Sequence, residues 1–231
     1  MEKKEESQNH WQDTESEEQG LPPRKFWRQP ASNSRIEWVE KRSRFLAFAR
    51  RIEGEADATD FLQILRREYP DAHHHVYAWQ TFTPDQRGGF SDDGEPSGTA
   101  GRPVFDLLRK NEIDQGALYV VRYFGGILLG SGGLVRAYRG AAAMALQEAG
   151  IERMILQRRC RISCSYRDAE KFQYQLSQAG VLLENAEYGA DVAYLVAFPP
   201  EREEEITALC ASLSCGTARL EKLELLYLPE A

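Results

Sequence analysis

Two glycine-rich segments carry the strongest chemical signal in this sequence. Residues 92–101 read D-D-G-E-P-S-G-T-A-G, and residues 122–138 read R-Y-F-G-G-I-L-L-G-S-G-G-L-V-R-A-Y. We expect each segment to lead into a helix. Glycines at this density let backbone N–H groups approach a ligand closely, and a helix N-terminus adds partial positive charge. The two segments therefore predict a site for an oxyanion or a phosphate, such as a nucleotide or an RNA backbone.

Two arginines of the second segment lie on either side of its glycines and could bind one anion bidentately. The predicted ligand-binding residues are these arginines, the glycines between them and one tyrosine: Arg122, Gly125, Gly126, Gly130, Gly132, Gly133, Arg136 and Tyr138. An alternative stays open, in which the glycines serve only tight turns and helix–sheet contacts. Neither segment matches a nucleotide-binding fingerprint.

The first segment adds carboxylates and hydroxyls to the site. The predicted rim consists of these side chains and one histidine: His74, Asp92, Asp93, Glu95, Ser97 and Thr99. Such a cluster could bind a divalent cation or supply acid–base chemistry. Alternatively, the carboxylates form ion pairs with the two arginines and hold the two loops together.

Other residue types give no support to a metal site, a cofactor or a nucleophile. The histidines at 73–75 offer too few ligands at a defined spacing, and the cysteines, spaced C-x3-C and C-x4-C, do not match zinc pairs. The motifs of common nucleophilic and metal-dependent hydrolases are missing from the sequence. We therefore predict no metal, no cofactor and no catalytic residue.

Composition and charge narrow the classes of partner. The 231 residues are 42% hydrophobic and 28% charged, with a net charge of −7, which is typical of a globular protein. An acidic chain is a poor candidate for bulk duplex binding, whereas a focused contact with RNA or phosphate stays open. The sequence contains neither an apolar stretch long enough to cross a membrane nor a secretion signal, so we expect a cytoplasmic protein.

Periodicity divides the chain into three parts. Residues 1–33 are polar and are predicted to be a disordered extension. Residues 34–156 are predicted to form the first domain, and residues 157–231 the second. The expected strands of the first domain are residues 35–41, 44–52, 74–82 and 117–124; its expected helices are 57–69, 102–111 and 134–149, with a long loop at 83–101.

The last third predicts the order βαββαβ of a ferredoxin-like domain. Residues 160–166 alternate as a strand, a helix follows from Asp168, and residues 181–188 and 192–198 form a hairpin around Gly189. A helix after Pro199–Pro200 and a strand at 219–228 complete the order. We expect the domain boundary near residues 155–158.

The motifs together resemble those of the IMPACT family. The match rests on His74 with Ala78 four residues later, on residues 92–101, and on residues 122–126 continued through 129–138. The resemblance implies an α+β protein, with a first domain like ribosomal protein S5 domain 2 and a ferredoxin-like second domain. The family commonly has Lys where this chain has Leu128, so one cation of the expected site is missing.

The resemblance also implies a role near the ribosome. Elongation factor G carries similar folds in two domains, and eukaryotic relatives regulate translation by binding proteins. We hypothesise a non-enzymatic regulatory protein that contacts the ribosome, RNA or a translation factor, or another protein partner, through a cleft between the two loops. The alternative hypothesis is a small metal-assisted hydrolase or transferase that uses residues 92–99 and His74.

Overall fold

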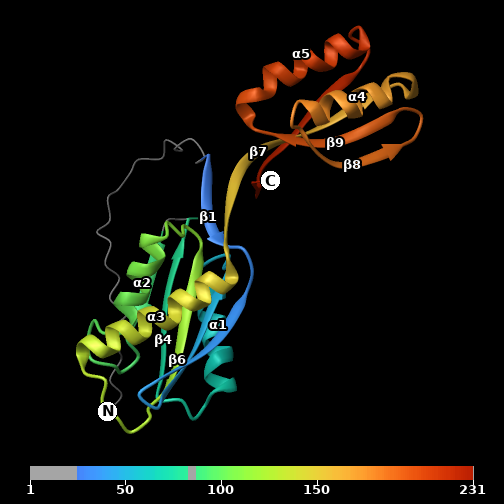
Figure 1. Cartoon of the computed structure of the whole chain (residues 1–231). Coiled ribbons are helices and arrows are strands. Elements are labelled where there is room, and N and C mark those ends of the chain that lie inside the picture. The colour runs from blue at the N-terminus through green and yellow to red at the C-terminus, as the bar shows by residue number, and fades with distance from the viewer. Residues whose placement is uncertain (1–24, 83–86, 231) are drawn as a thin grey trace. The chain divides into compact units, whose positions relative to one another are not determined.

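The computed structural model describes residues 25–82 and 87–230, and the chain divides into two compact units (Figure 1). The first unit contains Trp27–Arg153, and the second contains the residues from Met154 onward together with Lys25 and Phe26. The division falls three residues before the predicted start of the second domain at residue 157.

The first unit is built on one antiparallel sheet. Its strands lie in the order β2-β3-β6-β4-β5. Their bounds are β2 Ser34–Glu40, β3 Ser43–Arg50, β4 His74–Thr81, β5 Arg87–Ser91 and β6 Gly116–Tyr123; the helices are α1 Glu55–Glu68, α2 Gly101–Lys110 and α3 Ser131–Ala149. The almost continuous apolar run of β6 explains its place in the middle of the sheet, where both faces are covered.

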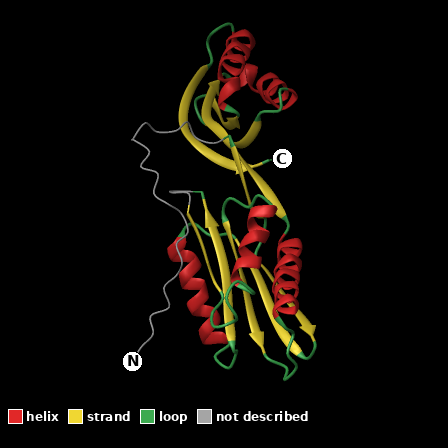
Figure 2. Ribbon diagram, turned by 90° about the vertical axis from the view of Figure 1, so that its left-hand side faces the viewer, coloured by secondary structure: helices red, strands yellow, loops and turns green. Residues whose placement is uncertain are grey.

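Alternation along the central strands separates two cores. One face of the sheet packs against α2 and α3 through Phe45, Val76 and Val120, and the other face packs against α1 through Phe48 and Tyr119. Figure 2 shows helices on both sides of this sheet. Side chains of even number in β4 and β6 therefore point toward α2 and α3.

The second unit has the predicted element order βαββαβ. Its elements are β7 Ile151–Cys164, α4 Tyr166–Gln178, β8 Leu182–Tyr188, β9 Val192–Phe198, a single 3-10 turn at Pro200–Arg202, α5 Glu203–Ser214 and β10 Arg219–Pro229. The strands pair antiparallel in the order β10-β7-β9-β8, and both helices contribute to one core. The predicted fold class, α+β with a ferredoxin-like second domain, is confirmed.

Two predicted irregular segments contain strands. The prediction of a disordered extension is wrong for β1, Phe26–Pro30, where the Trp27 ring is buried 5.4 Å from that of Phe82; residues 1–24 lie outside the described part. The predicted loop 83–101 contains β5, which pairs with β4 although it reads R-G-G-F-S. A side chain at Gly88 would meet the Phe105 ring at 2.9 Å, so packing, and not strand propensity, selects glycine there.

Two elements begin three or more residues before their predicted start. α3 begins at Ser131, three residues earlier than expected, so Gly132 and Gly133 belong to its first turn. β7 begins at Ile151, nine residues before the predicted strand. Within residues 25–82 and 87–230, no helix has the length and apolar character needed to cross a membrane.

Candidate functional site

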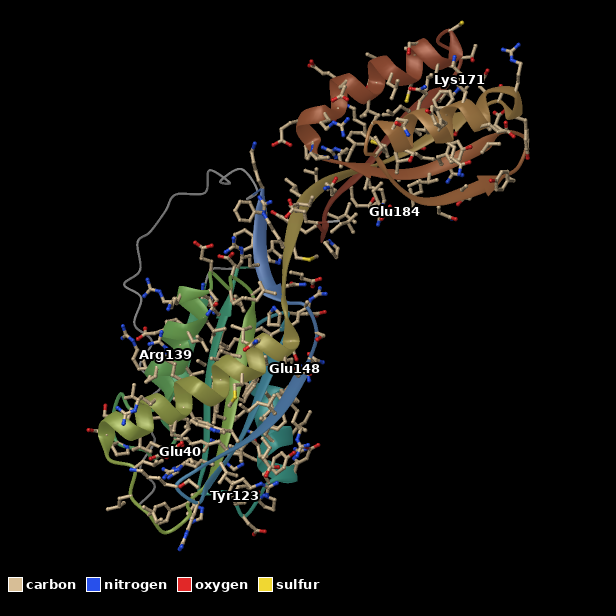
Figure 3. All side chains as sticks on the ribbon, in the orientation of Figure 1. Glu40, Tyr123, Arg139, Glu148, Lys171 and Glu184 are labelled. Carbon is tan, nitrogen blue, oxygen red and sulfur yellow. The ribbon has the colours of Figure 1, made fainter. Side chains whose placement is uncertain are left out.

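The candidate site lies at the edge of the first unit's sheet where β3 and β4 begin and β6 ends. The register pairs Arg122 with Phe45 on one side and with His74 on the other. These three side chains form one row on the face that carries α2 and α3. Figure 3 labels Glu40 and Tyr123, the last residues of β2 and β6 at this edge.

Asp92 organises the first glycine-rich loop. Its Oδ2 accepts the N–H of Gly98 at 2.8 Å, and its Oδ1 accepts those of Ala100 at 3.0 Å and Gly101 at 2.7 Å. The carboxylate thus satisfies donors at the start of α2, where negative charge is favourable. Asp92 closes the loop on itself.

Asp93 connects this loop to α1 and β4. Its carboxylate pairs with Arg66 at 3.0 Å and accepts the backbone N–H of His75 at 2.5 Å. Its carbonyl oxygen lies 2.8 Å from Nδ1 of His74. Because a carbonyl oxygen can only accept, Nδ1 of His74 carries the proton. The other ring nitrogen, Nε2, lies 3.6 Å from Oε1 of Glu95.

Glu95 is the centre of a buried polar cluster. Its Oε1 accepts a hydrogen bond from Nη1 of Arg122 at 2.5 Å and one from the Tyr138 hydroxyl at 2.6 Å. All three residues are more than nine-tenths buried. Burial, with a smaller contribution from Glu95, raises the pKa of Tyr138 far above its usual range, so the hydroxyl acts as a donor. Arg122 also donates to Oγ of Ser43 at 3.3 Å.

The second loop rests on the turn between β2 and β3. The N–H of Gly125 lies 3.3 Å from Oγ of Ser43, and a side chain at Gly125 would come within 2.0 Å of the Arg42 backbone. Only glycine fits this approach. Gly126 and Gly130 have positive φ angles of 82° and 72° and no atom near an added Cβ, so the structure leaves open space on one side of the loop.

The structure brings some predicted residues together and separates others. Glu95, Arg122, Tyr138 and His74 form one cluster, whereas Arg136 is exposed on the first turns of α3, with Nη1 3.8 Å from the position of a Cβ on Gly132. Arg122 is committed to Glu95 and Ser43. The two arginines therefore do not form a free pair, and only Arg136 offers a guanidinium to solvent.

Of the remaining predicted rim residues, Thr99 contacts the first loop itself and Ser97 does not enter the cluster. Thr99 is buried and its hydroxyl donates to the Pro96 carbonyl oxygen at 2.6 Å, while Ser97 is exposed.

Residues 25–82 and 87–230 contain no group of three or more His, Cys, Asp or Glu side chains that could hold a metal ion. An open cleft lined by Arg50, Arg51 and Asp57 lies at the other end of β3 and contains none of the predicted residues.

Sequence reasoning missed three contributors to this edge. Ser43 links Arg122 to Gly125, and the rings of Phe45 and Phe124 lie 5.5 and 5.6 Å from the Arg122 guanidinium carbon. The alternation of residues in β3 places Phe45 on the inner face, so the sequence contains a signal for the position of this ring. The role of Ser43 depends on the register between β3 and β6, which the sequence does not show.

Three regions form what we call the glycine-loop surface: the exposed residues among 124–133 of the second loop, the first turns of α3, and the exposed side of residues 92–99. The fold and this site define a two-domain α+β protein whose first domain presents two conjoined glycine-rich loops. Residues 41–146 match the Impact N-terminal domain, and residues 162–217 match a domain of unknown function, DUF1949. The chain belongs to the IMPACT family.

Similar proteins align with this chain along most of their length. The IMPACT family member YigZ of Escherichia coli (strain K12) is 37% identical over 86% of this chain and 98% of its own. The family member YvyE of Bacillus subtilis (strain 168) is 31% identical over 84% and 90%. A solved structure described as "Crystal structure of an hypothetical protein" is 36% identical, with a TM-score of 0.56 over 87% and 98%.

Proposed function

We propose that this chain is a non-enzymatic binding protein that regulates translation, contacting the ribosome, an RNA or a translation factor through the glycine-loop surface. One observation carries the proposal. Glu95 of the first loop bonds to Arg122 and Tyr138, which stand before and after the second loop. The two loops are therefore held together as one surface by a buried polar cluster.

The chemistry of this surface suits an anionic group. The first turn of α3 has no acidic residue and no side-chain cap, so the first N–H groups of the helix keep their hydrogen-bonding capacity. Gly132 leaves room for close approach, and Arg136 adds a cation beside it. Arg122 is a positioning residue in this proposal, because its guanidinium holds Glu95 and not the ligand.

Co-sedimentation with ribosomes through a sucrose cushion tests the proposal. Arg136→Glu reverses the exposed charge without touching the buried cluster, and we expect at least a tenfold loss of bound protein. Arg167→Glu is the matched control, because its side chain is 88% exposed in the second unit. Wild-type sedimentation of the Arg136 variant, or an equal loss in both variants, contradicts the proposed site.

The alternative of a metal-assisted hydrolase gains no support from the described residues. Asp92 and Asp93 are engaged with backbone N–H groups and with Arg66. Glu95 is engaged with Arg122 and Tyr138. Of these contacts, only the ion pair of Glu95 with Arg122 corresponds to the alternative in which carboxylates and arginines hold the two loops together.

A further inference from the structure

An exposed apolar turn borders the glycine-loop surface. Phe124 and Ile127 are each 40% exposed and Leu128 is 83% exposed, which is the highest value among the large apolar side chains in residues 25–82 and 87–230. The next residue, Leu129, is buried in the core beneath α2 and α3. Leu129 anchors the turn, so Ile127 and Leu128 are held in solvent by an ordered backbone.

Unpaired cations lie beside this turn. Gly125 packs against the backbone of Arg42, and Lys41 and Arg42 are both exposed. Within the described part of the chain, neither they nor Arg136 makes an ion pair with a carboxylate. The apolar turn is thus bordered by cations on the β2–β3 turn, and the N-terminus of α3 follows it.

The backbone of the β2–β3 turn gives a second, independent indication that the exposed cations have a binding role. Glu40 pairs with Ser43, so Lys41 and Arg42 form a two-residue hairpin loop, with φ angles of 45° and 65°. Two-residue hairpin loops with positive φ at both positions favour Asn-Gly. Lys41 and Arg42 adopt a backbone conformation that is unfavourable for residues other than glycine and asparagine. This indicates that their charges serve a purpose outside the turn.

We propose that this apolar turn and its cations form the docking surface for an acidic segment of a protein partner, with a large apolar side chain of that segment packed on Ile127 and Leu128. The inference rests on the proposed function, since it names the partner of the same surface. Charge complementarity brings the acidic segment to Lys41, Arg42 and Arg136. Burial of Leu128 against an apolar anchor supplies the contact that persists at high salt.

The side chains fit a protein better than a nucleic acid or a bilayer. Single-stranded RNA is bound by aromatic and arginine planes that stack on bases, whereas Ile127 and Leu128 are aliphatic. Stable anchoring to a bilayer needs a larger apolar face or a lipid chain. An acidic protein segment uses both the cations and the aliphatic side chains.

Site-specific photo-crosslinking of the full chain tests this proposal. Benzoylphenylalanine replaces Leu128, or Leu225 as a control that is 41% exposed in the second unit, and ribosome-containing lysate is irradiated. We expect mass spectrometry of the Leu128 adducts to give a partner peptide that is net negative and contains a large apolar residue. A synthetic copy of that peptide should bind the wild type at least tenfold more tightly than Leu128→Ser or Arg42→Glu, and Leu225→Ser should bind like wild type.

Several results overturn the inference. They are adducts with RNA or lipid, with a neutral or basic peptide, or with this chain's own residues 1–24, and Leu128 adducts that match those of Leu225. The proposed function can fail separately. If Arg136→Glu leaves ribosome sedimentation unchanged while Leu128 still crosslinks to an acidic peptide, the docking inference is supported and the proposed ribosome contact is contradicted. If sedimentation is lost while Leu128 crosslinks to RNA, only the docking inference fails.

Discussion

The two glycine-rich loops use their glycines for opposite purposes. In the first loop, Asp92 and Asp93 accept backbone N–H groups and Glu95 enters the core, so its polar groups are satisfied internally. The second loop supplies no carboxylate, exposes Leu128, and leaves the start of α3 uncapped by a side chain. Similar glycine content thus yields one loop that stabilises the fold and one that presents groups to a partner.

The largest effect on stability should come from the ion pair that joins the loops. Arg122→Ala leaves the Glu95 carboxylate buried without its cation, and we expect the free energy of unfolding in urea to fall by about 3–5 kcal/mol. Adding Glu95→Gln should restore part of the loss because it removes the uncompensated charge. If the double variant is less stable than Arg122→Ala, the buried charge is not the cause.

A smaller loss of stability is expected when the first loop loses Asp92, its main hydrogen-bond acceptor. Asp92→Ala removes the partner of three backbone N–H groups, and should lower the free energy of unfolding by about 2 kcal/mol. Asp106→Ala on α2 is the control: its carboxylate is exposed in an i, i+4 pair with Arg102, and the expected loss is below about 0.5 kcal/mol. Equal losses in the two variants would show that Asp92 does not organise the loop.

The protein should become more stable when the backbone strain in the β2–β3 turn, on which the second loop rests, is relieved. We expect Arg42→Gly to raise the free energy of unfolding by about 1 kcal/mol, because a non-glycine residue at positive φ costs about that much. Arg35→Gly, in the regular strand β2, should instead lower it by about 0.5–1 kcal/mol. A stabilised Arg42→Gly protein that no longer binds its partner would show that the charge is kept at the expense of stability.

A pH dependence of stability is predicted from His75, whose ring is buried and whose backbone N–H donates to Asp93 of the first loop. Burial lowers the pKa of His75 below its ordinary value of 6.5. The unfolded chain therefore binds a proton more readily, so this contribution is complete above pH 6.5 and declines as the pH falls below it. His75→Gln should reduce the slope of the free energy of unfolding between pH 7.5 and 5, measured by urea denaturation at a series of pH values; an unchanged slope contradicts the prediction.

The smallest change in stability is expected at Leu128, the exposed apolar side chain of the second loop. Leu128→Ser should alter the free energy of unfolding by less than about 0.5 kcal/mol, whereas Leu129→Ala should cost about 2–3 kcal/mol because that side chain is buried. Chemical denaturation of both variants measures the difference. A large loss for Leu128→Ser would mean that the second loop also serves the fold.

Local patterns in the sequence determined the class of the fold and most of its elements. Alternation identified β3 and β4, and an almost continuous apolar run identified β6. The second domain's order βαββαβ followed from short periodic segments separated by glycine and proline. The residues of the site were also visible, since Glu95, Arg122 and Tyr138 stand in the two glycine-rich segments.

Only the tertiary structure decided how those residues are used. The register places Arg122 between Phe45 and His74 beneath the first loop, and a buried guanidinium requires a charged partner, so Glu95 takes the position that an external anion was expected to fill. Likewise β5 forms because its glycines admit the rings of Trp79 and Phe105. Such choices depend on contacts between segments far apart in the chain, which local sequence patterns do not encode.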